Sequence, residues 1–133
     1  MVKLYLIAVL TTLTITGSAN VSSQWIGNWL VVVENGVDIS SKGVTYVISE
    51  NSISQLVPGL CEETAVFLNV SGNNFTTKTS KSNCPWSSPG KVTEGNISFE
   101  EGTLILSFPE HGKRFIQKLR KIILKEPLEE LTT

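Results

Sequence analysis

Hydrophobic and polar positions along the chain form short runs rich in Val, Ile, Thr and Phe, separated by polar segments that contain glycine or proline. The runs recur about every ten residues, and before the C-terminal end none shows a sustained helical period. This spacing is typical of an antiparallel sandwich or barrel. Asn35-Gly36, Glu101-Gly102 and His111-Gly112 suit tight turns, because glycine accepts a positive φ at low cost. The predicted strands are 29–33, 44–49, 52–57, 64–70, 74–79, 96–99, 103–108 and 113–119.

We therefore expect an all-β fold, a small antiparallel up-and-down β-barrel of about eight strands. Closure of the barrel would remove the exposed edges that an open sheet must protect. After Leu119 the chain either extends the last strand or forms a short helical turn that Pro127 interrupts.

The N-terminal segment has the features of a secretory signal peptide. Lys3 precedes an apolar run at 4–13, and the small residues Gly17 and Ala19 stand where a signal peptidase requires them. A run of about ten apolar residues is too short for a membrane span, which needs roughly 20. We expect a signal peptide at 1–19, a single domain at 20–133, no membrane span and an extracellular location.

Cysteines and glycosylation patterns agree with secretion. Cys61 and Cys84 form an even pair, for which a disulfide is the favoured state in an oxidising compartment and two free thiols are the alternative. Four acceptor patterns for N-glycosylation occur, at Asn20, Asn69, Asn74 and Asn96. If they are used, these asparagine side chains lie in solvent.

The glycosylation patterns also assign faces to the strands, because side chains alternate along a strand and a glycan cannot lie in a core. With Asn69 outward, Val66 and Leu68 should point inward. By the same alternation, Phe99 should lie on the face opposite Asn96.

Composition and charge exclude several classes of protein. Hydrophobic residues make up 41% and charged residues 17% of the chain, which is ordinary for a globular protein. A net charge of -1 is not that of a nucleic-acid-binding domain, which normally carries a strong positive excess. One histidine and two cysteines are too few for a four-ligand zinc site of Cys and His, and no metal or cofactor is expected.

Catalytic groups are scarce, so we expect the protein not to be an enzyme. His111 is the only candidate base for nucleophilic hydrolysis, and it lies in a predicted turn. Adjacent carboxylates occur at Glu62-Glu63, Glu100-Glu101 and Glu129-Glu130. Adjacent residues on a strand face opposite ways, so these pairs would not cooperate.

The segment that opens the mature domain carries a resemblance to a known family. Gly27-x-Trp29, just before the first strand, resembles the signature of lipocalins and related calycins, in which the Trp plugs the closed end of the barrel. The resemblance implies that a late basic residue, Arg120 or Lys118, packs over this indole. Such a cation-π contact contributes roughly 0.5 to 2 kcal/mol.

The resemblance to lipocalins implies a carrier that holds a small hydrophobic molecule of the lipid, fatty acid or retinoid class. Tyr46 and Gln117 are the polar residues expected to orient the ligand. Val31 and Val33 are included in the wall because they share the face of Trp29. The expected wall consists of Val31, Val33, Tyr46, Ile48, Val66, Leu68, Phe75, Phe99, Leu104, Leu106, Phe115 and Gln117.

Two alternatives remain open. Gln55–Gly59 resembles the first inhibitory hairpin of cystatins, and Pro85-Trp86 resembles their second, which implies inhibition of papain-like proteases. The stretch before Gln55 lacks the long amphipathic helix around which a cystatin sheet wraps. The other alternative is a ligand-free recognition module for an extracellular protein partner, because a small barrel can fill itself with side chains.

Overall fold

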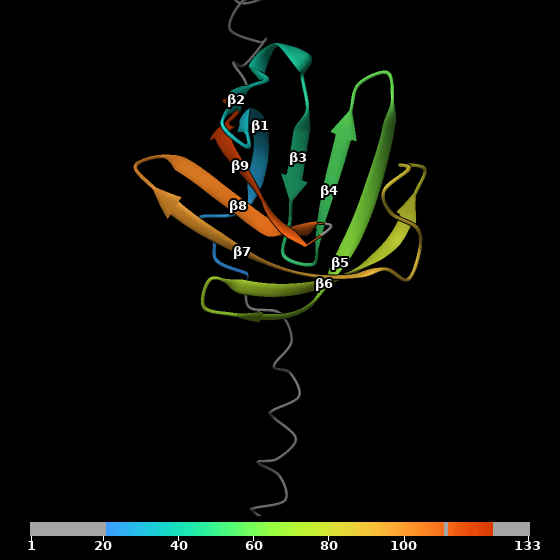
Figure 1. Ribbon diagram of the computed structural model, residues 1–133. Coiled ribbons are helices and arrows are strands. Elements are labelled where there is room, and N and C mark those ends of the chain that lie inside the picture. The colour runs from blue at the N-terminus through green and yellow to red at the C-terminus, as the bar shows by residue number, and fades with distance from the viewer. Residues whose placement is uncertain (1–20, 111, 124–133) are drawn as a thin grey trace, which may run out of the picture.

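The computed structural model describes residues 21–110 and 112–123, most of which lie in β-strands (Figure 1). All eight predicted strands are present, which confirms the all-β fold. The pattern did not predict two short elements, a second strand and a 3-10 helix. The elements are β1 (Gly27–Glu34), β2 (Val37–Asp38), η1 (Ser40–Lys42), β3 (Thr45–Ile48), β4 (Ser52–Val57), β5 (Cys61–Ser71), β6 (Asn74–Ser82), β7 (Val92–Glu100), β8 (Thr103–Glu110) and β9 (Lys113–Lys121). The predicted signal peptide, Asn20, His111 and the segment from 124 onward lie outside the described residues.

The strands form one antiparallel sheet that closes on itself. Their order is β2-β1-β3-β4-β5-β6-β7-β8-β9, and β1 also pairs with β9. β3 pairs with the first half of β1, whereas β2 pairs with its last two residues. Long strands that follow one another in the chain are therefore neighbours around the barrel (Figure 1). This is the expected up-and-down order.

The described part of the chain contains only one helical element, the three-residue η1. These residues therefore do not form the sheet wrapped around a long helix that the resemblance to cystatins implies. They also include no helix long and apolar enough to cross a membrane.

A β-bulge in β1 changes which residues face the interior. The pairing of β1 with β9 skips Val32, which leaves one extra residue in β1. Such a bulge reverses the inside-outside alternation beyond it. Val33 therefore pairs with the exposed Lys118, and Glu34 pairs with the buried Gln117. The inward position predicted for Val33 is wrong, and an acidic side chain faces the interior instead.

A second bulge lies in β5, where Leu68 is the extra residue between Phe67 and Asn69. Counting alternation back from the exposed Asn69 across this bulge predicts the wrong face for the preceding residues. Phe67 is buried, whereas Val66 and Leu68 are 36% and 49% exposed. The inward positions predicted for Val66 and Leu68 are therefore wrong.

The end of the barrel near Gly27 is filled with side chains. Trp29 is only 1% exposed, and its indole Nε1 donates a hydrogen bond to the carbonyl oxygen of Trp25 at 2.8 Å. The ring of Trp25 lies 6.5 Å from that of Phe67, and Phe99 meets Trp29 edge-on at the same centroid distance. The same apolar core includes Val31, Ile48, Ile97, Leu104 and Leu119.

The cation over the Trp29 ring belongs to Lys121. Its Nζ lies 5.6 Å from the ring centroid and donates a hydrogen bond to the carbonyl oxygen of Ile26 at 3.3 Å. Side chains alternate along β9, so Arg120 and Lys118 lie on the opposite, exposed face. The predicted role of Arg120 is therefore wrong by one residue.

Gly27 lies directly beneath this lysine. A Cβ atom built on Gly27 would lie 2.8 Å from Cε of Lys121, and the φ of Gly27 is +146°. The absence of a side chain lets β1 pass close under Lys121.

The predicted disulfide is present. Cys61, the first residue of β5, is bonded to Cys84 in the loop between β6 and β7, and both residues are buried. Of the predicted glycosylation positions, Asn69 and Asn74 are exposed and Asn96 is partly buried. Nδ2 of Asn96 donates a hydrogen bond to Oδ1 of Asn74 at 3.0 Å.

Candidate ligand-binding cavity

The barrel is hollow at the end opposite Trp29. A cavity of about 470 Å³ lies there, whereas one water molecule occupies roughly 30 Å³ in the liquid. Its walls are formed by the last residues of β1 and β8, the first residues of β7 and β9, and the strands β3 to β6. The cavity is within the size range of small-molecule sites, about 300 to 1,000 Å³.

Apolar surface makes up most of the cavity wall, and polar side chains supply the rest. Phe108 and Phe115 pack together with their ring centroids 5.2 Å apart. On the other side, Phe75 lies over Gly95 of the neighbouring strand, where a Cβ atom would come within 3.0 Å of the ring. The apolar lining consists of Ile39, Val44, Ile53, Val57, Ala65, Phe75, Leu106, Phe108 and Phe115.

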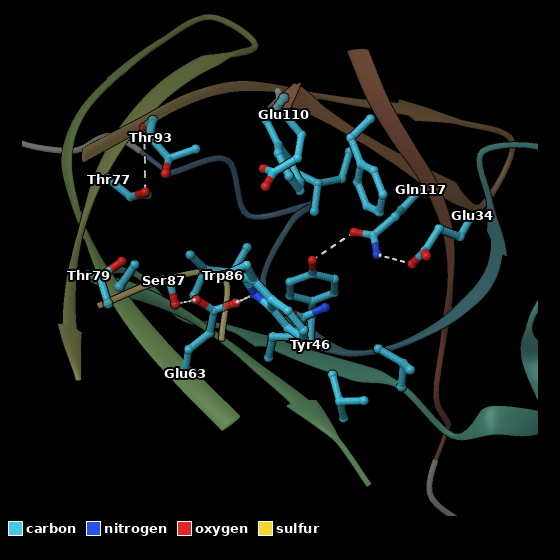
Figure 2. A pocket seen from close by; sticks show the side chains of 18 of the residues that line it. Glu34, Tyr46, Glu63, Thr77, Thr79, Trp86, Ser87, Thr93, Glu110 and Gln117 are labelled. Carbon is cyan, nitrogen blue, oxygen red and sulfur yellow. Dashed lines mark hydrogen bonds between the residues drawn. The ribbon is translucent and has the colours of Figure 1, made fainter. Parts of the chain in front are cut away.

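A chain of hydrogen bonds crosses one side of the cavity (Figure 2). The hydroxyl of Tyr46 donates to Oε1 of Gln117 at 2.7 Å, and Nε2 of Gln117 donates to Oε1 of Glu34 at 3.0 Å. A carboxylate can only accept, so Glu34 fixes the orientation of the Gln117 amide and the direction of the Tyr46 proton. The phenolic oxygen of Tyr46 retains its capacity as an acceptor.

The ionisation of Tyr46 reflects these surroundings. Burial raises the pKa of its hydroxyl far above the ordinary value for tyrosine, and the negative charges of Glu63 and Glu34 raise it further. The hydrogen bond to Gln117 acts in the opposite direction. Tyr46 is therefore neutral at physiological pH, and it experiences a negative potential at the cavity wall.

A disulfide-anchored loop forms part of the rim. Glu63 on β5 accepts hydrogen bonds from the indole Nε1 of Trp86 at 2.8 Å and from the hydroxyl of Ser87 at 2.5 Å (Figure 2). Nζ of Lys91 donates to the carbonyl oxygen of Trp86 at 3.0 Å. Trp86 follows Cys84 by two residues, so the disulfide holds this loop against the cavity.

Charged side chains surround the cavity at different depths. Glu34, Glu63 and Glu110 are partly buried and lie around it on different sides (Figure 2). Lys42 and Lys91 also line the cavity, but both side chains are exposed to solvent. The acidic groups are thus more enclosed than the basic ones.

The predicted wall residues fall into three groups. Those that line the cavity are Tyr46, Phe75, Leu106, Phe115 and Gln117. Val31, Ile48 and Leu104 do not line it, because they lie in the core toward the filled end. Phe99 does not line it either: it is 37% exposed and packs edge-on against Trp29. Those that face outward because of the two bulges are Val33, Val66 and Leu68.

The acidic lining of the cavity was not predicted from the sequence. Glu110 follows Phe108 by two residues on the same strand, so simple alternation was a usable signal for it. Glu34 faces inward because of the bulge in β1. Glu63 shares the face of the buried Phe67 by alternation, but a count that starts at Asn69 crosses the bulge at Leu68 and gives the opposite face. Trp86 enters from a loop, where no periodicity exists.

The chain matches no protein-family model, and no curated protein is significantly similar to it. In the part of the chain that the structure describes, no group of three or more His, Cys, Asp or Glu side chains could hold a metal ion. Function is therefore inferred from the cavity and its lining.

Proposed function

We propose that this protein is a secreted carrier that holds a small, mainly apolar molecule in the open end of its barrel. The observation that carries the proposal is a cavity of about 470 Å³ with a largely apolar wall. A barrel of this size can fill itself with side chains, as it does around Trp29. Its other end stays hollow, which favours a carrier over a ligand-free recognition module.

Binding would be driven by the burial of the ligand's apolar surface, at about 25 cal/mol per Å². The wall is held in place by strand pairing and by the Phe108–Phe115 contact, so little reorganisation is needed. Tyr46 and Gln117 provide polar groups that can orient the ligand. No catalytic step and no cofactor are part of the proposal.

Two further features support the proposal. The buried Trp29, with Gly27 two residues before it and Lys121 over its ring, matches the arrangement that the resemblance to lipocalins implies. The Cys61–Cys84 disulfide is compatible with an oxidising, extracellular location.

Titration with Nile red, a neutral dye that fluoresces in apolar surroundings, tests the proposal. We expect saturable enhancement with one site per chain, and competition by the apolar probe decanol. Ala65 lines the cavity, so Ala65→Phe should fill it and abolish binding. The matched control is Val66→Phe, which adds the same ring to the outward-facing neighbour and should leave binding intact.

Equal binding by the Ala65→Phe and Val66→Phe variants would contradict the proposal, because the dye would then bind outside the barrel. An assay against a papain-like protease tests the inhibitor alternative, for which the carrier proposal expects no inhibition.

A further inference from the structure

We infer that the ligand of this cavity carries a cationic, hydrogen-bond-donating head group, such as a protonated amine, on an apolar body. The inference rests on the proposed carrier function and specifies the class of ligand. It follows from the charges around the cavity and from the direction of the hydrogen bonds in its wall.

The charge around the cavity is negative where a ligand would be enclosed. The described lining includes the carboxylates of Glu34 and Glu63 and the ammonium groups of Lys42 and Lys91. The carboxylates are partly buried, whereas both lysines are exposed. Water and salt screen exposed charges more strongly than enclosed ones, so the carboxylates dominate the potential inside.

The hydrogen bonds lead to the same ligand class independently. In the chain from Tyr46 through Gln117 to Glu34, each donated proton points toward the carboxylate. Within this chain, the phenolic oxygen of Tyr46 and, among the described contacts, Oε2 of Glu34 remain available as acceptors for a ligand. An ammonium has three N–H donors for these acceptors, whereas an ionised carboxylic acid has none.

The loop that carries Trp86 at the rim also favours a cationic ligand. Both oxygens of Glu63 accept hydrogen bonds from the Trp86 loop, which holds the carboxylate at the cavity wall. The Trp86 indole itself lines the cavity. An aromatic face beside enclosed carboxylates is a favourable environment for a cation.

The raised pKa of the Tyr46 hydroxyl supports the inference. Part of that shift comes from the charges of Glu63 and Glu34, which both disfavour a further negative charge at this wall. An anionic head group at the same place would meet the same repulsion. A cation would be attracted.

A matched set of probes tests the inference. Decylamine, decanol and decanoate share one apolar tail and differ in head group, and each is titrated in competition with Nile red at neutral pH and low salt. We expect decylamine to bind about tenfold or more tightly than decanol, and decanoate to bind most weakly. Added salt should weaken the binding of decylamine while leaving that of decanol unchanged.

Charge-neutralising variants assign the effect to the cavity. Glu34→Gln keeps an acceptor for Gln117 but removes the charge, and should bring decylamine close to decanol without weakening decanol. The matched control is Glu100→Gln, an exposed residue near the filled end of the barrel, which should change neither affinity. Lys42→Gln at the rim should tighten the binding of decylamine.

The outcomes separate the two proposals. Decanol or decanoate could bind as tightly as decylamine and lose this binding in the Ala65→Phe variant. In that case the carrier function stands and the inferred cationic head group is wrong. If none of the three probes displaces Nile red from the cavity, the carrier function fails, and the inference fails with it. If Glu34→Gln and Glu100→Gln weaken decylamine equally, the cation is not held by the cavity carboxylates.

Discussion

Tyr46 is buried in the cavity wall, and its hydroxyl is tied to Gln117 and through it to Glu34. The residue therefore links the stability of the fold to the polar side of the site. Because the folded state holds the hydroxyl in its neutral form, the stability of the protein should depend on pH in the alkaline range.

The sign of this dependence follows from linkage. The pKa of Tyr46 is raised in the folded state, so above about pH 10 the unfolded chain releases the tyrosine proton while the folded protein keeps it. The resulting stabilisation is present below that pH and is lost as the pH rises. Relative to Tyr46→Phe, the wild-type protein should lose about 1.4 kcal/mol of unfolding free energy per pH unit.

Urea unfolding of both proteins between neutral pH and pH 11 measures this difference. At neutral pH, Tyr46→Phe should be less stable by about 1 kcal/mol, because Gln117 loses the hydrogen bond from the hydroxyl. The gap should close as the pH rises. A gap that stays constant over the whole range would show that Tyr46 ionises normally.

At the scale of elements, the pairing of β6 with β7 depends on a glycine. A Cβ on Gly95 would lie 2.9 Å from the carbonyl oxygen of Ser107 and would meet the ring of Phe75. Gly95→Ala should therefore lower the unfolding free energy by about 1 to 3 kcal/mol. It should also weaken Nile red binding, because the displaced Phe75 ring lines the cavity.

Thermal unfolding of the Gly95→Ala variant, with and without Phe75→Leu, tests whether the clash with the Phe75 ring causes the loss of stability. The smaller side chain should recover part of the stability lost in Gly95→Ala, which a double-mutant cycle detects as a coupling between the two sites. Strict additivity of the two substitutions would argue against the steric account.

The loop that carries Trp86 depends on the disulfide. Cys61 and Cys84 are separated by 23 positions, and a cross-link over such a loop contributes about 3 kcal/mol by the chain-entropy model. The Cys61→Ser/Cys84→Ser variant should be less stable by about this amount and should bind Nile red more weakly. A reducing agent should affect the wild-type protein but not the variant, and equal sensitivity of both would contradict this assignment.

The same elements show how far sequence reasoning could go. Strand positions follow from β-branched runs and turn residues, which act locally, so the eight long strands and their order could be predicted. The faces of Val33, Val66 and Leu68 could not, because each depends on where a bulge inserts one residue. A bulge arises from how two paired strands fit together, so the sequence of either strand alone does not predict its position.

The candidate site was predictable to the same degree. Tyr46, Phe75, Leu106, Phe115 and Gln117 lie on strands whose alternation is unbroken where they face the cavity. The residues predicted near Trp29 have the right face, but they lie at the filled depth of the barrel. Depth along the axis depends on strand tilt and closure, for which the sequence carries no local signal.

At the scale of the whole molecule, the barrel combines a packed half with a hollow half. Backbone amides around the buried core should exchange hydrogen most slowly, because local opening there breaks the most packing. We expect slow exchange at Trp29, Leu104 and Leu119, and faster exchange at Gln55 and Glu63 beside the cavity.

Hydrogen exchange followed by mass spectrometry, with and without a saturating probe, measures this contrast. A bound molecule should slow exchange selectively in peptides from the hollow half. Uniform protection along the barrel, or slowing confined to the packed half, would contradict the division of the barrel into these two parts.

The closure between β1 and β9 has a consequence for how the protein forms. These are the first and last long strands in the described chain. The edge of β1 that pairs with β9 therefore stays unpaired until β9 has been synthesised. Unpaired strand edges readily join edges of other chains, and contacts between distant segments form slowly. A truncation that removes β9 would therefore leave a sheet with an unpaired edge, and we expect the truncated protein to aggregate.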